Sequence, residues 1–200
     1  MAFELSGLIV LQFSLTCVGT SLYISFFEWS VHKYLMHSLL WPYPFHAHAL
    51  VHHGLFRADS TYHLHKQQPD KVTFAWWNGP VLIIVQLPIL AGLSYFFGWS
   101  IMAGGLASMF VYYFLYEALH WCMHVPRNRL IEQTRMFRYL NAHHYLHHRH
   151  AYRNLNVVFP FADWVLGTRM SVSEIQFTSE PHPVAETIEF GYAREVPVSG

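Results

Sequence analysis

The sequence predicts an all-α fold: an integral membrane bundle of about three spans, helical hairpin included, with a histidine-rich helical cap on the cytoplasmic side. Long stretches of the 200-residue chain are almost free of charge, and only 12% of its residues are charged. Sixteen histidines, most of them in short clusters, lie next to these stretches. A soluble all-helical core is the alternative, but an uncharged run of 45 residues argues against it.

Two apolar stretches determine the number of spans. Residues 5–31 carry one charge, Glu28, and residues 72–116 carry none. A membrane helix needs about 20 apolar residues to cross roughly 30 Å of hydrocarbon, so the first stretch is one span. As a single helix the second stretch would be about 68 Å long at 1.5 Å per residue, so it forms two spans. We place the spans near 5–31, 74–97 and 100–122.

Prolines and glycines mark the hairpin. Pro80 and Pro88 fall in the middle span, where a proline ring removes a helical hydrogen bond and is expected to kink the helix. Gly98 and the Gly104–Gly105 pair are candidates for the bend between the second and third spans, or for close helix packing.

The positive charges predict the orientation. All twelve Lys and Arg residues fall on one side of the three spans. The positive-inside rule therefore places the loop 33–71 and the chain after residue 124 in the cytoplasm, with the N-terminus outside. Every histidine then lies on the cytoplasmic side or at a cytoplasmic helix end. The cationic residues are Lys33, Arg57, Lys66, Lys71, Arg127, Arg129, Arg135, Arg138, Arg149, Arg153, Arg169 and Arg194.

The chain is predicted to hold one membrane domain, residues 1–170, followed by a polar, partly disordered tail at 171–200. A net charge of zero gives no reason to expect nucleic-acid binding. Cys17 and Cys122 form no CxxC pair, so no thiolate zinc site is indicated. The sequence has no glycine-rich nucleotide fingerprint and no haem attachment motif, so any reducing equivalents must come from another protein.

Ten clustered histidines are the candidate metal ligands. Neutral imidazole is the commonest metal ligand and suits iron, zinc, copper and nickel. Ten imidazoles exceed the roughly six positions of an octahedral shell, so the sequence predicts at least two ions. The candidates are His32, His37, His48, His52, His53, His120, His124, His144, His147 and His148.

Helical spacing groups most of these histidines. Residues three or four apart share one helix face. His32 and His37 are five apart, about 140° around an ideal helix, so we expect the helix to fray near His37 or the two residues to serve different ions. The sets expected to share a face are His48 with His52, His120 with His124, and His144 with His147 and His148, the last on a surface helix over 133–150.

Glu28 and Glu117 lie inside or at the edge of the hydrocarbon, one turn before His32 and His120. A carboxylate there is costly and is a functional candidate. We expect each to accept the second N–H of a ligand imidazole; the alternative is an acid that snorkels to the interface or pairs with a basic residue. The other acids, including Asp163, are expected to be solvated or to cap helices.

The remaining histidines are weaker candidates. His46, His143 and His150 adjoin the clusters and are possible substitutes for a neighbour. Isolated histidines are more often packing or interface residues than ligands. The isolated ones here are His63, His65 and His182.

The ordered boxes HKYLMH, HALVHH, HWCMH and HYLHH, followed by the stretch from Asn154 to Thr168, resemble the fatty acid hydroxylase superfamily, which includes sterol desaturases and carotenoid hydroxylases. The resemblance covers residues 28 to 168, most of the chain. One departure is that the second box of that family is usually H-x2-HH, whereas this chain has His48-x3-His52-His53. His48 is retained as the ligand, with His46 as its substitute.

The resemblance implies an oxidoreductase in lipid biosynthesis. It implies a non-haem di-iron centre, with the ten clustered histidines as ligands, on the cytoplasmic face of a multi-pass membrane protein. It also implies O₂-dependent hydroxylation or desaturation of a lipid: a fatty acyl chain, a sterol or hopanoid, or a carotenoid. Electrons would come from a ferredoxin or a cytochrome b5 type protein with its reductase. Phe110, Tyr113 and Phe114 are expected to line the substrate path.

The competing class is a zinc protein, either a membrane hydrolase or a non-catalytic metal binder. A catalytic zinc takes three protein ligands and a structural zinc takes four, so ten histidines are more than one such site uses. A transporter would place its ligands near the bilayer midplane, whereas these lie at helix ends and in loops.

The one-sided charge predicts the topology of the chain. After replacement of Cys17 and Cys122, single cysteines at positions 60 and 185 should react only with membrane-permeant reagents in intact cells, and a cysteine at position 2 should react with impermeant ones. Labelling of position 60 by an impermeant reagent would contradict the three-span arrangement.

Overall fold

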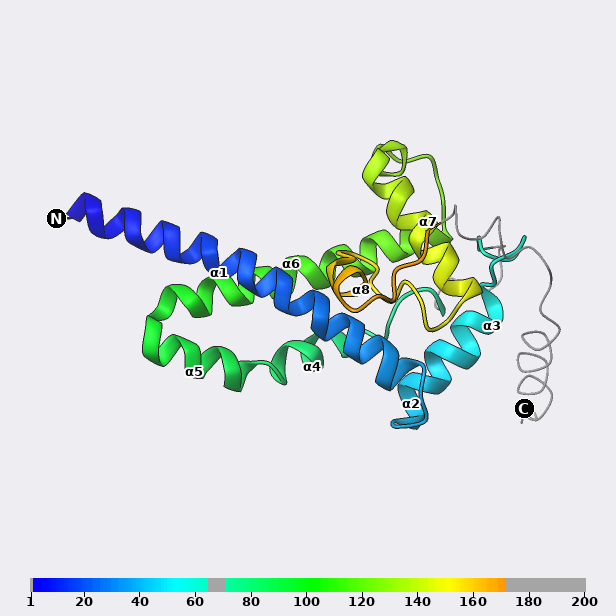
Figure 1. The fold of residues 1–200 in the computed structure, drawn as a ribbon, viewed down its shortest axis with the longest axis horizontal. Coiled ribbons are helices and arrows are strands. Elements are labelled where there is room, and N and C mark those ends of the chain that lie inside the picture. The colour runs from blue at the N-terminus through cyan, green and yellow to red at the C-terminus, as the bar shows by residue number, and fades with distance from the viewer. Residues whose placement is uncertain (1, 65–70, 172–200) are drawn as a thin grey trace.

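The protein is all-helical over the residues that the computed structural model describes, 2–64 and 71–171. Figure 1 shows a long bundle with a helical cap at one end. The elements are α1 (Ala2–Val31), η1 (His32–Met36), α2 (Pro42–Phe45), η2 (His46–His52), α3 (His53–Leu55), α4 (Asn78–Ile84), α5 (Leu87–Phe97), α6 (Trp99–His124), η4 (Ile131–Gln133), α7 (Arg135–Arg149) and α8 (Phe161–Val165).

Two helices are long and apolar enough to cross a membrane, and a bent pair makes a third candidate. The long ones cover Ser6–Met36 and Trp99–His124, and the pair is α4 with α5, which meet at an angle of 41°. The bend falls where it was predicted, because Pro88 at the start of α5 has no N–H to bond the carbonyl of Ile84. Pro80 lies in the first turn of α4, where a proline is tolerated.

Three glycines let the helices approach closely. A Cβ atom at Gly79 would lie 2.4 Å from the Tyr113 ring, and one at Gly105 would lie 2.4 Å from a methyl group of Leu90. Gly104 packs against α1 in the same way. Gly98 makes the turn between α5 and α6 with a φ of 98°, a conformation that favours glycine. Gly98 is therefore the bend, and the Gly104–Gly105 pair serves packing.

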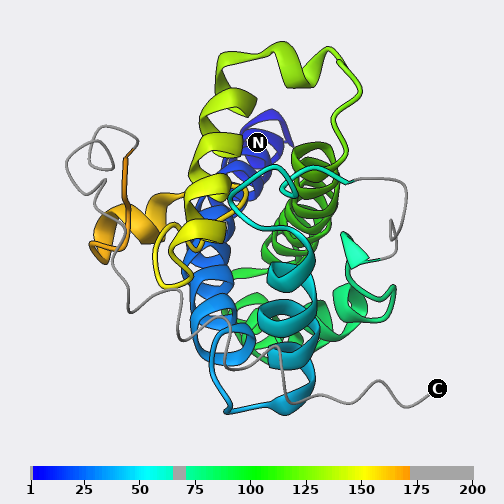
Figure 2. The ribbon, with the colours of Figure 1, turned by 90° about the vertical axis from the view of Figure 1, so that its right-hand side faces the viewer.

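The cap gathers the segments that carry the histidines. Figure 2, which views the molecule from this end, shows α1, α6, α7 and the segment 46–55 standing around a common centre. Helix α7 begins at Thr134, whose hydroxyl accepts a hydrogen bond from the Phe137 N–H at 3.1 Å. Its inner face buries Phe137, Leu140 and the histidines of the last box. The predicted surface helix over 133–150 is therefore α7, although half of it is packed against the bundle.

The predicted all-α class with a histidine-rich helical cap is confirmed for the described residues. The spans predicted near 5–31, 74–97 and 100–122 agree with the three apolar segments. The predicted tail, residues 171–200, lies outside the described residues except for Ser171.

Candidate metal centre

Ten histidines form two adjacent groups of five. The first cluster is defined as His32, His37, His48, His53 and His147, and the second cluster as His52, His120, His124, His144 and His148. Within each cluster one ring nitrogen per residue lies within 4.8 Å of all the others. The clusters touch, since the rings of His53 and His148 stack with centroids 4.3 Å apart. These are the same ten residues that the sequence selected as candidate ligands.

A π-helical turn joins His32 and His37 in one cluster. The backbone N–H of His37 donates to the His32 carbonyl at 3.1 Å, the i→i+5 bond of a π-helix. This wider turn brings residues five apart onto the same face, and the two rings stack with centroids 5.1 Å apart. The regular α-helix ends before His37, as expected, and His37 itself has non-helical dihedral angles. The alternative, that the two residues serve different ions, does not fit, because both fall in one cluster.

A second π-helix, η2, has the same effect on the next histidine box. It places His48 and His53, five apart, in the first cluster, and it directs His52 to the second. His48 and His52 share a face as predicted, since their rings stack with centroids 5.2 Å apart, but they belong to different clusters. Helix α7 is also divided between the clusters, because His147 joins the first and its neighbour His148 the second. Each cluster thus draws on three separate segments of the chain.

Backbone carbonyls orient the imidazoles. In five residues the Nδ1–H group donates to a main-chain oxygen, which fixes the ring and leaves the Nε2 lone pair free. These bonds tie the rings to loops and helix ends around the cap. The pairs are His32 with Leu155 at 2.5 Å, His52 with Lys71 at 3.1 Å, His124 with Tyr62 at 2.7 Å, His147 with Arg153 at 2.9 Å, and His148 with Phe56 at 2.5 Å.

The freed Nε2 atoms converge. The Nε2 atom of His144 lies 3.1 Å from that of His124 and 2.9 Å from that of His148, both of which present lone pairs. One N–H cannot satisfy two such neighbours. In the first cluster the Nε2 atoms of His32 and His48 are 2.8 Å apart. Lone pairs directed at one small volume repel each other unless a cation lies between them.

The donor set fits metal ions. Metal–imidazole bonds of about 2.0–2.1 Å, as in zinc sites, put opposite ligands roughly 4.2 Å apart, close to the spread within each cluster. Among the described residues, Nε2 of His52, Nε2 of His120 and Nδ1 of His144 are buried without a hydrogen-bond partner. Buried polar atoms without partners are rare, and a bound ion explains the two Nε2 atoms.

The cap keeps its imidazoles neutral. Burial away from water lowers the pKa of His52 from 6.5 to about 4, more than its bond to the Lys71 carbonyl raises it. Burial, together with the neighbouring rings, holds the pKa values of His144, His147 and His148 well below the ordinary range. A neutral imidazole is the metal-binding form, so these side chains are ready ligands at neutral pH.

The two half-buried acids, Glu28 and Glu117, do not contact the imidazoles as predicted. Glu28 accepts hydrogen bonds from the Tyr112 hydroxyl at 2.5 Å, the Val157 N–H at 2.6 Å and the Asn156 amide at 3.0 Å. Glu117 accepts from the Phe74 N–H at 3.4 Å and from the Tyr113 hydroxyl. The carbonyls described above take the role that was expected of these acids. Glu28 acts one step further out, on the loop that carries Leu155.

Asp163 is the residue that sequence reasoning missed. It was expected to be solvated or to cap a helix, but it is fully buried. Its carboxylate accepts from the N–H groups of Leu155 and Asn156 at 2.9 and 2.7 Å, from the Thr168 hydroxyl at 2.6 Å, and from the His143 ring at 3.1 Å. Burial alone would raise its pKa, but these bonds outweigh that effect and lower it. The sequence signal that could have identified it is that Asp163 is the single acid in the otherwise apolar run Phe161–Val165.

The other histidines lie outside both clusters. His143 is buried and bonds Asp163 instead of joining a neighbouring ligand set. His46 lines a cavity beside the second cluster, and His63 and His150 belong to neither group. Since His48 lies in the first cluster, its substitute His46 is not needed there. His65 and His182 lie outside the described residues.

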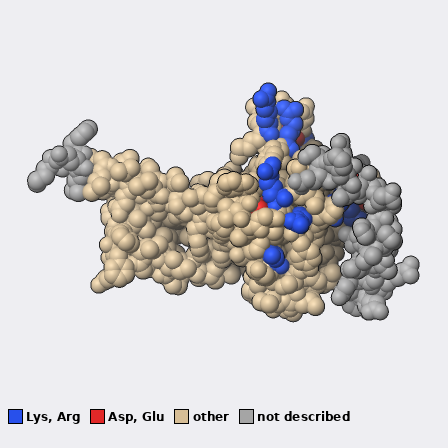
Figure 3. Space-filling view, viewed as in Figure 1, with Lys and Arg blue, Asp and Glu red and all other residues tan. Residues whose placement is uncertain are grey.

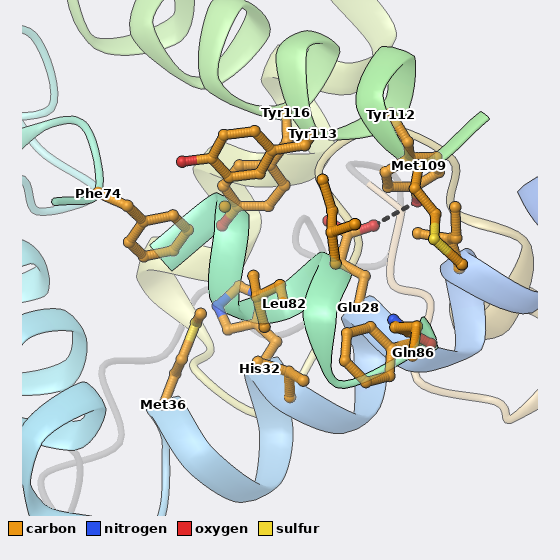
Figure 4. A pocket seen from close by; sticks show the side chains of 15 residues that line it. Glu28, His32, Met36, Phe74, Leu82, Gln86, Met109, Tyr112, Tyr113 and Tyr116 are labelled. Atoms are coloured by element: carbon orange, nitrogen blue, oxygen red, sulfur yellow. Dashed lines mark hydrogen bonds between the residues drawn. The ribbon is translucent and has the colours of Figure 1, made fainter. Parts of the chain in front are cut away.

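Two adjacent cavities open on the clusters. The larger one is lined by His48, His52 and His120. The other, called the inner cavity, lies between α1, α4 and α6, and Figure 4 shows His32, Glu28 and the three tyrosines of α6 around it. Apart from these groups and Gln86, its lining is apolar. The shared lining residues are Val31, Met36, Phe74 and Leu82.

Comparisons with models of protein families, with curated proteins and with solved structures find no match to this chain.

Removing one ligand from either cluster should release one ion. The native protein is expected to bind two metal ions per chain, and His37→Ala or His124→Ala should each bind about one, measured by elemental analysis of purified protein. His150→Ala is the matched control, because it removes a histidine of the cap that lies in neither cluster. A native stoichiometry of one, or an equal loss in His150→Ala, would contradict the two-site arrangement.

Asp163→Asn should weaken the first cluster selectively. The change disturbs the loop whose Leu155 carbonyl orients His32, and lost support of this kind typically costs about 10–100-fold in metal affinity. Competition with a chelator should show one weakened ion and one of native affinity. Asp59→Asn, at an exposed acid in the loop before Tyr62, is the control. Equal weakening of both ions in Asp163→Asn would show a general loss of folding instead.

Proposed function

We propose that this protein is a membrane-bound, O₂-dependent hydroxylase or desaturase of a lipid substrate, with two iron ions held by the two histidine clusters. The observation that carries the proposal is the convergence of ten neutral imidazoles on two adjacent volumes, beside cavities lined mainly by apolar residues. The resemblance of the histidine boxes to the fatty acid hydroxylase superfamily supports the same reaction class.

The number of donors favours iron over zinc. Structural zinc sites take four ligands and catalytic ones three protein ligands, whereas each cluster here offers five imidazoles. Zinc also has no redox chemistry. Two iron ions in these clusters would supply the reductive activation of O₂ that breaking an unactivated C–H bond requires. Hydrolysis by zinc, or metal storage without turnover, therefore explains less of the site.

The cavities support an apolar substrate. The inner cavity lies between helices of the three candidate spans, with Ile24, Phe27 and Met109 among its walls. A lipid that enters from the bilayer would present a carbon near His32, His48, His52 and His120. Tyr113 lines this cavity, but Phe110 and Phe114, expected to line the same path, are 59% and 70% exposed and are not among its walls. Phe114 is one position from Tyr113 and therefore points to another side of α6.

The chain itself positions the substrate and excludes water. Tyr116 and Phe74 stack, with ring centroids 5.4 Å apart, where the two cavities meet and beside His120. Glu28 and Tyr112 satisfy each other across the inner cavity, and apart from His32, Gln86 and the other tyrosines of α6 the remaining wall is apolar. Such a wall holds an alkyl segment without offering it a competing polar partner, while the metal centre performs the bond cleavage.

The proposed location is a multi-pass membrane protein with its metal centre on the cytoplasmic face and its N-terminus outside. On the face shown in Figure 3, Lys and Arg gather over the half of the molecule that holds the cap, and the other half shows none. The reaction consumes O₂ and two electrons. We assign the electrons to a separate ferredoxin or cytochrome b5 type protein, because the described residues hold no haem or flavin motif.

Lipid profiling tests the function. Cells that express the protein under iron-replete conditions should accumulate a lipid carrying one added oxygen or one new double bond, detected by mass spectrometry. A hydroxylated product should take up the heavy isotope from labelled O₂. The purified protein should contain close to two irons per chain.

The control strain expresses His124→Ala, which lacks one ligand of the second cluster and should yield no product. A native protein that contains only zinc and leaves every lipid unchanged in the presence of an electron donor would refute the proposal. Equal product in the native and His124→Ala strains would also refute it.

A further inference from the structure

A third cavity lies farther from the histidine clusters. It is situated between α1, α5 and α6 and is lined by Thr20, Leu93 and Phe97 among others. It shares Gln86 and Met109 with the inner cavity described above. Neighbouring cavities thus share wall residues, in order from the one at His120 beside the clusters to the one at Phe97 near the opposite end of the bundle.

A hydrogen bond lies at the junction of the second and third cavities. The Tyr23 hydroxyl donates to the Gln86 side-chain oxygen at 2.5 Å. Gln86 is 4% exposed and lies between α4 and α5, where Pro88 breaks the helix. Figure 4 shows its side chain at the edge of the inner cavity, beyond Glu28 as seen from His32. The hydrogen bond ties α1 to the bent helix pair, with Gln86 on the wall of both cavities and Tyr23, which is 40% exposed, on the wall of the third.

The Tyr23–Gln86 bond lies at a defined distance from the histidine clusters along α1. Tyr23 precedes His32 by nine residues on α1, which corresponds to about 14 Å at 1.5 Å per residue. A chain that passed the junction would have to push apart a paired amide and phenol in surroundings without water, where an unpaired polar group is costly. A chain that ends before the junction meets mainly apolar walls, the paired Glu28 and the tyrosines of α6.

We propose that the Tyr23–Gln86 pair determines substrate specificity as the end stop for a single unbranched alkyl chain. This inference rests on the proposed function and assigns a substrate class to it. The methyl end lies against the pair, and the polar end lies toward the cavity lined by Lys71 and His46. Fused-ring lipids do not suit cavities that share only a few wall residues. The oxidised carbon is then set by its distance from the methyl end.

Binding and product position test the stop. Purified protein is incubated with equimolar dodecanoate, hexadecanoate and eicosanoate, and the bound species are compared by native mass spectrometry. Gln86→Ala should raise the share of eicosanoate. Tyr23→Phe should raise the ratio of eicosanoate to hexadecanoate about threefold, since a hydrogen bond between membrane helices averages about 0.6 kcal/mol. Where turnover occurs, the native protein should oxidise each chain at a constant distance from its methyl end.

Gln12→Ala is the matched control. Gln12 is another glutamine in the spans, bonded to Ser100 and to the Phe97 carbonyl, and it lines none of the three cavities. Its binding ratio should equal the native one. Unchanged ratios in both Gln86→Ala and Tyr23→Phe, or an equal change in Gln12→Ala, would overturn the stop. Shifted ratios without any oxidised product would support the stop and refute the proposed function.

Discussion

The structure of the cap depends on one constraint: imidazoles whose Nδ1–H groups are held by backbone carbonyls must direct their Nε2 lone pairs inward. Five such bonds involve carbonyls from the loop after α3, the segment at Lys71 and the loop after α7. Each carbonyl is a strong acceptor that cannot change its role, so the tautomer is fixed by the main chain. The cap is therefore arranged around lone pairs that the protein alone leaves unsatisfied, and burial keeps these rings neutral.

The sequence predicted which segments are apolar and which histidines come together, but it did not predict the local backbone geometry. Uncharged runs located the three apolar segments, because membrane-spanning length and the proline rule are properties of local sequence. Histidine spacing identified the ten residues that come together. Their division between clusters depended on two π-helical turns, which no residue type in His32–Met36 or His46–His52 announces. Such turns occur often at functional sites, so a five-residue spacing between candidate ligands is itself a sign worth testing.

The roles of the acids could not be read from the sequence, because they depend on contacts between distant segments. Glu28 and Asp163 both hold the loop that begins at Asn154, the first through Val157 and the second through Leu155. Together they fix the carbonyl that orients His32. Because Glu28 precedes a histidine box by one helical turn, we expected it to bond an imidazole directly. Instead, it holds the loop whose Leu155 carbonyl bonds the His32 ring. A carboxylate that acts through a backbone carbonyl supports the ring without adding a negative charge next to the imidazoles.

The bend between α4 and α5 shapes the cavities that lie beyond the histidine clusters. Pro88 lacks the N–H that would continue the helical hydrogen bonds from α4 into α5. The two helices therefore meet at an angle of 41°, with Gln86 at the break. The turn keeps α4 against α6, where Gly79 admits the Tyr113 ring, while α5 packs Leu90 against Gly105. Between these two contacts lie the inner cavity and the Tyr23–Gln86 bond. The proline that sets the kink therefore also sets the position of Gln86 on the wall between the inner and the third cavity.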